Sequence, residues 1–150
     1  MNDKSVRASM LLRKPPHVVF DAFINPATLT QFWLSATTGP LAPGACVTWQ
    51  FMVPGAADTV SVKRFEPDRH LAFRWGGGIE VAMDFAPYAG DATHLTVTCT
   101  GFDEGELLAQ AADTVEGFAI VLCDLKTLLE SGRSANLVRD KGELIAQAKR

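Results

Sequence analysis

The stretch Asp103–Gly132, DEGELLAQAADTVEGFAIVLCDLKTLLESG, decides the fold. Asp103 and Glu106 have the spacing of a capping box, and Gly132 stands where a left-handed residue commonly ends a helix. Between these ends, apolar residues recur at steps of three or four: Leu107, Ala111, Val115, Phe118, Leu122, Leu125 and Leu129. At about 1.5 Å per residue, the pattern predicts one amphipathic helix roughly 40 Å long. Its apolar stripe needs an equally long apolar partner.

The preceding chain supplies this partner as runs of alternating apolar and polar residues, which predict strands that are buried on one face. The first run is Ser5–Arg13, and the others follow between residues 47 and 99: Val47–Val53, Val60–Phe65, Leu71–Trp75, Ile79–Phe85 and Leu95–Cys99. Short turns between consecutive runs predict an antiparallel meander. Phe65 is out of phase with Val60 and Val62, which predicts a β-bulge near Lys63–Arg64.

Two short helices are predicted directly after the first strand. His17–Ile24 carries apolar residues at helical spacing, and so does Ala27–Leu34 after the capping pair Asn25-Pro26. Ser35–Gly44 is rich in glycine, proline and threonine and is predicted to be a loop. Together the elements predict an α+β fold, in which a curved antiparallel six-stranded sheet wraps around the long C-terminal helix.

The domain boundary is expected at the end of the long helix. We predict that residues 1–132 form a single domain and that residues 133–150 form a C-terminal tail. The tail contains apolar residues but Gly142 interrupts them, so a frayed end and a short docked helix both fit the pattern. The tail residues Leu137, Val138, Leu144 and Ile145 also make a homodimer a plausible partner arrangement.

Composition narrows the class of protein. A chain of 150 residues with 47% hydrophobic residues fits one globular domain. The net charge of −3 argues against binding to nucleic acid, which needs a clustered basic surface. No apolar run approaches the roughly 20 residues of a membrane span. The first residues carry no apolar leader and the three cysteines follow no paired pattern, so a cytoplasmic location with reduced thiols is expected.

Several segments in order resemble one protein family. Val19–Trp33 looks like the family's opening V-W-x-A-L-T-D-P-x-x-L-x-x-W-W, and Pro43-Gly44 precedes a strand as it does there. Glu66–Trp75 looks like its P-P-x-x-L-x-x-x-W segment. Thr93–Phe102 and Glu116–Leu129 look like its close, G-T-x-L-x-L-x-H-x-G-F and G-W-x-x-x-L-x-x-L. The family is named for the C-terminal domain of the activator of the heat-shock-protein-90 ATPase, in the START-like, Bet v 1-like (SRPBCC) superfamily.

The resemblance covers roughly residues 5–132 and implies a helix-grip fold that encloses an apolar cavity. It implies no single activity, because members include ligand binders and cyclases as well as the chaperone activators. This sequence departs from the family at two positions. Cys99 stands where the family often has histidine, and Phe118 stands where it often has tryptophan. Any chemistry that the histidine performs in relatives is therefore lost here.

No group of residues in the sequence carries a catalytic or metal-binding signature. The histidines fall at a helix start, a turn and a strand start, without the spacing of metal ligands: His17, His70 and His94. Cys99 is predicted to be a buried structural thiol, because no histidine is placed to activate it. Glu80 and Asp84 alternate onto the polar face of their strand. We therefore predict no catalytic residue, no metal and no cofactor.

The inward faces of the strands are aromatic and aliphatic, and one helix cannot fill the hollow of a strongly curved sheet. The remaining space is predicted to bind an apolar small molecule, either lipid-like or flat and aromatic. The predicted cavity residues are Phe20, Phe23, Trp33, Trp49, Phe51, Phe73, Trp75, Val81, Met83, Phe85, Val97, Cys99, Val115, Phe118 and Leu122. Two alternatives stay open: a cyclase or hydratase that acts on an apolar substrate in the cavity, and a co-chaperone domain that stimulates a chaperone ATPase.

Overall fold

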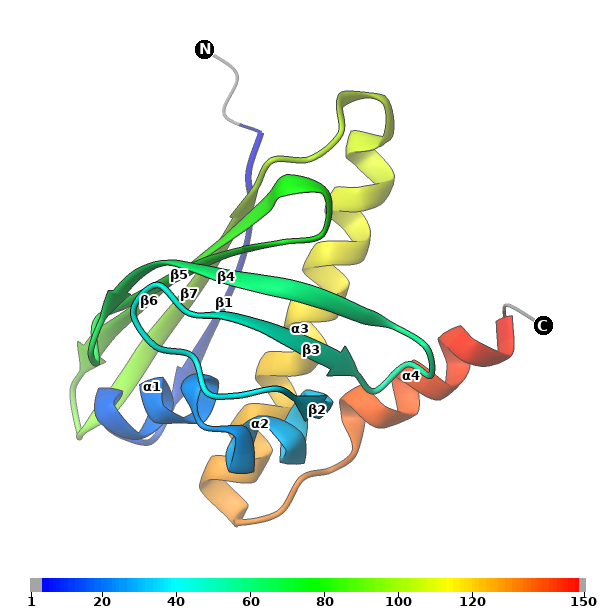
Figure 1. Cartoon of the computed structure of the whole chain (residues 1–150). Helices are drawn as coiled ribbons and strands as arrows, with labels where there is room; N and C mark the ends of the chain where they lie inside the picture. The colour runs from blue at the N-terminus through cyan, green and yellow to red at the C-terminus, as the bar shows by residue number, and fades with distance from the viewer. Residues whose placement is uncertain (1–3, 149–150) are drawn as a thin grey trace.

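The computed structural model describes residues 4–148 and forms an α+β fold (Figure 1). The elements in chain order are β1 (Val6–Leu12), α1 (Pro16–Ile24), α2 (Pro26–Phe32), β2 (Leu34–Thr37), β3 (Cys46–Phe51), β4 (Ala57–Glu66), β5 (His70–Trp75), η1 (Gly76–Gly78), β6 (Ile79–Tyr88), β7 (Ala92–Thr100), η2 (Glu104–Glu106), α3 (Leu107–Ser131) and α4 (Leu137–Ala148).

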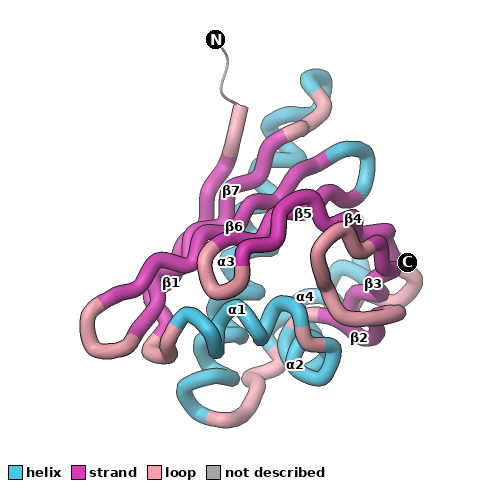
Figure 2. Tube along the Cα trace, turned by 60° about the vertical axis from the view of Figure 1, so that its left-hand side comes forward, coloured by secondary structure: helices cyan, strands magenta, loops and turns pink. Residues whose placement is uncertain are grey.

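All strands belong to one antiparallel sheet with the order β1-β7-β6-β5-β4-β3-β2. The strand direction turns steadily from β1 to β3, so the sheet is twisted and curved (Figure 1). Helix α3 lies across one face of the sheet, and α1 and α2 cover one end of it (Figures 1 and 2). The predicted long helix on a curved meander is therefore confirmed.

The sheet has seven strands, and the prediction of six is wrong. The additional strand is β2, which lies within the segment predicted to be a loop and pairs with β3 through an irregular register. Ser35 donates its hydroxyl proton to the carbonyl oxygens of Gln50 and Phe51, each 3.1 Å away. A four-residue edge strand of mostly small and polar residues has no alternation that sequence analysis can detect.

The structure confirms the predicted bulge in β4 and the predicted C-terminal cap of α3, but not the predicted capping box at the N-terminus of α3. The register of β4 against β5 shifts between Val62 and Arg64, which confirms the bulge. Gly132 ends α3 in the left-handed region at φ 84° and donates its N–H to Leu128 O. At the other end, Asp103 caps the short turn η2 rather than α3, and Gln110 Oε1 accepts from its N–H at 2.9 Å. The capping box with Glu106 does not form.

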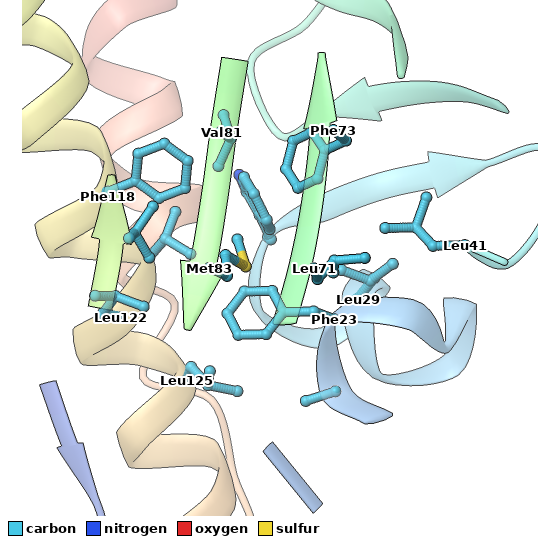
Figure 3. Close-up of a cluster of buried hydrophobic side chains, with 14 of the residues drawn as sticks. Phe23, Leu29, Leu41, Leu71, Phe73, Val81, Met83, Phe118, Leu122 and Leu125 are labelled. Carbon is cyan, nitrogen blue, oxygen red and sulfur yellow. The ribbon is translucent and has the colours of Figure 1, made fainter. Parts of the chain in front are cut away.

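Only the second half of α3 is buried against the sheet. Its buried apolar residues are Phe118, Val121, Leu122, Leu125 and Leu128. Figure 3 shows Phe118, Leu122 and Leu125 of this helix facing the sheet residues Val81 and Met83. The first half of α3, residues 107–117, contains no buried residue. The stripe predicted from the sequence is therefore buried mainly in the second half of α3, while Leu107 at the start of the helix is partly buried against the core.

A buried carboxylate connects α3 to the tail. Asp124 is 1% exposed although it lies among the apolar residues of α3. Its Oδ2 accepts from the Ser134 hydroxyl at 2.6 Å, and its Oδ1 accepts from the Ala135 N–H at 2.8 Å. These bonds satisfy the carboxylate and hold the chain after Gly132 against α3. Of the two alternatives for the tail, the structure shows the docked helix, α4.

The burial difference along α3 predicts the effect of matched truncations. Leu122 is fully buried and Leu108 is 84% exposed on the same helix. We expect Leu122→Ala to lower the free energy of unfolding by about 2–5 kcal/mol through lost transfer energy and a new cavity. Leu108→Ala should change it by less than about 0.5 kcal/mol. Chemical denaturation measures both values, and equal costs would contradict the placement of the core.

Candidate functional site

A cavity of about 340 Å³ lies between α3, α4 and the chain around the β3–β4 turn. Its volume falls at the lower end of the range for small-molecule sites. Aliphatic, aromatic and glycine residues form nearly all of its lining, and three polar or charged side chains join them. The lining residues are Trp33, Phe51, Met52, Val53, Ala56, Trp75, Asp113, Thr114, Gly117, Phe118, Ile120, Val121, Val138, Lys141, Gly142 and Ile145.

Four aromatic rings form the inner wall of the cavity. Trp75 stacks on Phe118 with ring centroids 5.8 Å apart and an interplanar angle of 19°. Trp33, at the end of α2, meets Phe118 edge-on at 5.6 Å and Trp75 at 5.9 Å. Phe51 of β3 packs edge-on against Trp75 at 5.7 Å. These contacts pack the four rings together, and the rings offer a broad apolar surface to a ligand.

Helix α4 forms the outer wall through Val138, Gly142 and Ile145, which recur at helical spacing. Gly142 is the one buried residue of α4. A Cβ atom at this position would lie 2.7 Å from Met52 O and 3.3 Å from Val53 N. The helix therefore touches the backbone at the β3–β4 turn, and only glycine permits this approach.

Charged groups gather on the side of the cavity where α3 meets α4. Lys141 Nζ lies 3.2 Å from Glu116 Oε1, an ion pair between the two helices. Asp113 and Thr114 on the first half of α3 also line the cavity. Because Glu116 and Lys141 keep 56% and 35% of their side chains exposed, their attraction is screened and contributes little stability. The deep wall is thus apolar, and the polar groups lie toward solvent.

The structure brings four of the predicted residues to this cavity: Trp33, Phe51, Trp75 and Phe118. Ten others are packed in the core and do not line it: Phe20, Phe23, Trp49, Phe73, Val81, Met83, Phe85, Val97, Cys99 and Leu122. The reason is that aromatic rings fill the hollow themselves. Phe20 and Phe23 of α1, for example, pack on Phe85 at 5.2 and 6.1 Å.

Val115 does not line the cavity either, and its side chain is 36% exposed on the first half of α3. Sequence reasoning missed the whole contribution of α4. Its signal was present as Val138, Gly142 and Ile145, which follow one another at steps of four and three. Gly142 was interpreted as an interruption, whereas the structure uses it as the point of contact. No residue of Ser35–Gly44 lines the cavity.

The remaining candidate groups for chemistry lie elsewhere. Burial raises the pKa of the Cys99 thiol to about 12, so it stays protonated and unreactive near neutral pH. Glu80 pairs with Arg74 at 3.3 Å, and Asp84 pairs with His70 at 2.7 Å, both on the outer face of the sheet. Within residues 4–148, no group of three or more histidine, cysteine, aspartate or glutamate residues is placed to hold a metal ion.

Residues 13–130 match the family described as Activator of Hsp90 ATPase homolog 1-like protein. The chain belongs to this family. The resemblance found in the sequence is therefore confirmed, and α4, with its side of the cavity, lies beyond the matched region. No curated protein matches the sequence. Over the described part of the chain, no helix is both long and apolar enough to cross a membrane.

Solved structures of other proteins share the fold. The protein SSP2350 from Staphylococcus saprophyticus is 26% identical with a TM-score of 0.77, over 87% of this chain and 94% of that one. DynU16, a protein of the dynemicin biosynthetic locus, is 26% identical with a TM-score of 0.74, and the match covers 89% of this chain but 49% of DynU16. The Aha1 dimer from Colwellia psychrerythraea has a TM-score of 0.75 over 87% and 98% of the chains, and at 17% identity it shows the fold alone.

Two glycines on the cavity walls predict opposite responses to the same substitution. A Cβ at Gly117 of α3 would meet no atom within 4 Å, whereas one at Gly142 would meet backbone at 2.7 Å. Gly117→Ala should stabilise the protein by up to about 1 kcal/mol through helix propensity. Gly142→Ala should displace α4 and accelerate amide hydrogen exchange throughout it. Exchange in α4 that stays as slow as in the unsubstituted protein would show that the contact does not hold the helix.

Proposed function

We propose that this protein binds a small hydrophobic molecule in the cavity between α3, α4 and the β3–β4 turn. The observation that carries the proposal is the aromatic inner wall of Trp33, Phe51, Trp75 and Phe118, left facing open space in an otherwise packed fold. Large apolar side chains in a domain of this size normally pack on other side chains. A cavity that keeps four of them available is typical of a ligand site.

The chemistry of the wall supports a neutral ligand. Burying an ion without a partner is costly, and the inner wall offers no charged group to provide one. Lipid-like chains and flat aromatic molecules both satisfy this condition, whereas nucleotides and sugars do not. The 26% identity with DynU16, a protein of a biosynthetic locus, supports a small molecule over a macromolecule as the ligand.

The placement of the carboxylates favours a binding protein over an enzyme. A cyclase or hydratase needs an acid or base inside its cavity. Glu80 and Asp84 face outward in surface ion pairs, and Glu116 is 56% exposed at the α3–α4 boundary. Asp113 lines the cavity but belongs to the exposed first half of α3. Nothing in this arrangement supplies a desolvated proton donor or acceptor against the inner wall.

The cavity unites the domain with the tail. Because α4 supplies one wall, we propose that residues 133–150 act with residues 1–132 as one binding unit.

Val138 and Ile145 face the cavity, which leaves Leu137 and Leu144 as the exposed apolar residues of α4. These two support the proposal of a homodimer, which light scattering tests. The free thiols Cys46, Cys99 and Cys123 support a reducing, cytoplasmic location.

A pair of variants at Gly117 tests the binding site without disturbing the core. Gly117→Leu places a side chain into the cavity and also raises helix propensity, while Gly117→Ala leaves most of the cavity open. A panel of acyl chains and flat polycyclic aromatics is screened by thermal shift and tryptophan emission. At a hundredfold excess over its dissociation constant, a ligand should stabilise the native protein and Gly117→Ala by about 2.7 kcal/mol.

Gly117→Leu should fold but lose this stabilisation. The proposal fails if no member of the panel shifts the native protein. It fails equally if Gly117→Leu binds the same compounds as well as Gly117→Ala does, because the ligand would then occupy another place.

A further inference from the structure

Trp49 of β3 is a buried tryptophan with an unpaired polar atom. Its side chain is fully buried. Within residues 4–148, all other buried side-chain nitrogen and oxygen atoms have a hydrogen-bond partner, and Trp49 Nε1 has none. Buried polar groups in native proteins are almost always paired, so an exception requires an explanation. Phenylalanine would fill much of the same space without leaving a donor unsatisfied.

The neighbours of Trp49 cannot accept its proton. The ring of Trp49 lies 4.9 Å from Trp33, 5.4 Å from Phe73, 6.2 Å from Trp75 and 6.3 Å from Phe51, measured between centroids. An indole nitrogen only donates, and a phenyl ring has no lone pair. The faces of these rings offer at most a weak N–H···π contact. The protein therefore leaves this donor without a conventional acceptor.

The ring of Trp49 lies behind the inner wall of the binding cavity. Trp33, Phe51 and Trp75 separate Trp49 from the cavity, and all three belong to its inner wall. Each of these three rings lines the cavity on one side and packs on Trp49 on the other, so a single layer of side chains lies between Trp49 and the cavity. Trp49 itself does not line the cavity, so a molecule bound against the wall reaches the indole N–H only if Trp33 or Trp75 moves aside.

We propose, on the basis of the proposed function, that the Trp49 indole N–H is the polar anchor of the ligand. The ligand class that it selects is a neutral, flat and largely apolar molecule with a carbonyl or similar acceptor oxygen at its buried end. Such an oxygen pairs a donor that is otherwise unsatisfied, so the molecule gains a bond that a pure hydrocarbon cannot form. A carboxylate is excluded, since no cation lines the inner wall to compensate its charge.

The orientation of the ligand follows from this anchor. The acceptor oxygen points inward past Trp33 and Trp75, the ring system lies along the aromatic wall, and any further polar substituent faces the side of Asp113 and Lys141. The protein thus discriminates by one hydrogen bond at the closed end of the site. Shape and apolar area are common to acceptor-bearing ligands and their hydrocarbon analogues, and they supply affinity rather than selectivity.

The test uses fluorene and fluorenone, flat tricyclic molecules that differ by one carbonyl oxygen. The full chain and its Trp49→Phe variant are titrated with each compound and followed by calorimetry. In the native protein fluorenone should bind about three- to tenfold more tightly than fluorene, the worth of one neutral hydrogen bond. In Trp49→Phe fluorenone should lose this advantage and bind no more tightly than fluorene, because its buried carbonyl then has no donor. Gly117→Leu should bind neither fluorene nor fluorenone, and this control shows whether both compounds bind in the cavity.

A second experiment uses the native protein and therefore does not require that Trp49→Phe folds. The chain has three tryptophans, so a ¹⁵N-labelled sample shows three indole N–H resonances. Fluorenone should move the Trp49 resonance downfield and slow its exchange with solvent, whereas fluorene should not. If fluorene and fluorenone bind equally and the Trp49 resonance does not respond, the anchor is wrong while the binding function stands. If neither compound binds, the anchor and the proposed function both fail.

Discussion

The structure depends on how the second half of α3 packs against the curved sheet. From Phe118 to Leu128 this helix buries its apolar residues among the inward side chains of the strands. The aromatic rings of α1, α2 and the central strands fill the rest of that space, so the core closes without a void at this end. The first half of α3 has no buried residue, and of its side chains Leu107 packs partly buried against the core. The cavity is the consequence, since Trp33, Phe51, Trp75 and Phe118 lie where the packing stops.

Two contacts place α4 so that it closes the outer side of the cavity. The buried carboxylate of Asp124 holds Ser134 and Ala135, which sets the direction in which the chain leaves α3. Gly142 then lets α4 approach the backbone of Met52 and Val53. Each contact joins a residue within the region matched to the family, residues 13–130, to a residue beyond it. The inner wall is thus built by residues within the region matched to the family, and the outer wall is built by α4, which follows that region.

Most of the fold could be predicted from the sequence because strand alternation and helix periodicity are local patterns. The bulge near Lys63–Arg64 and the Gly132 cap were also legible, since each follows from residue type and phase. The edge strand β2 was missed because it is held by pairing to β3, which no local pattern records.

The residues of the site could be predicted only in part. Inward position alone cannot distinguish Phe73, which packs against other rings, from Trp75, which faces the cavity, because that difference depends on where α4 lies. The role of Asp124 could not be predicted, because its partners Ser134 and Ala135 follow it by ten and eleven positions.

The central claim is that the cavity between α3 and α4 is where a ligand binds. The most direct measurement is a set of nuclear Overhauser contacts between a bound flat aromatic molecule and the methyl groups of the isotope-labelled protein. We expect contacts to Val121, Val138 and Ile145, which come from the two helices that face each other across the cavity. Contacts to core methyls such as Leu71 or Met83, with none to α4, would place the ligand inside the sheet and contradict the account.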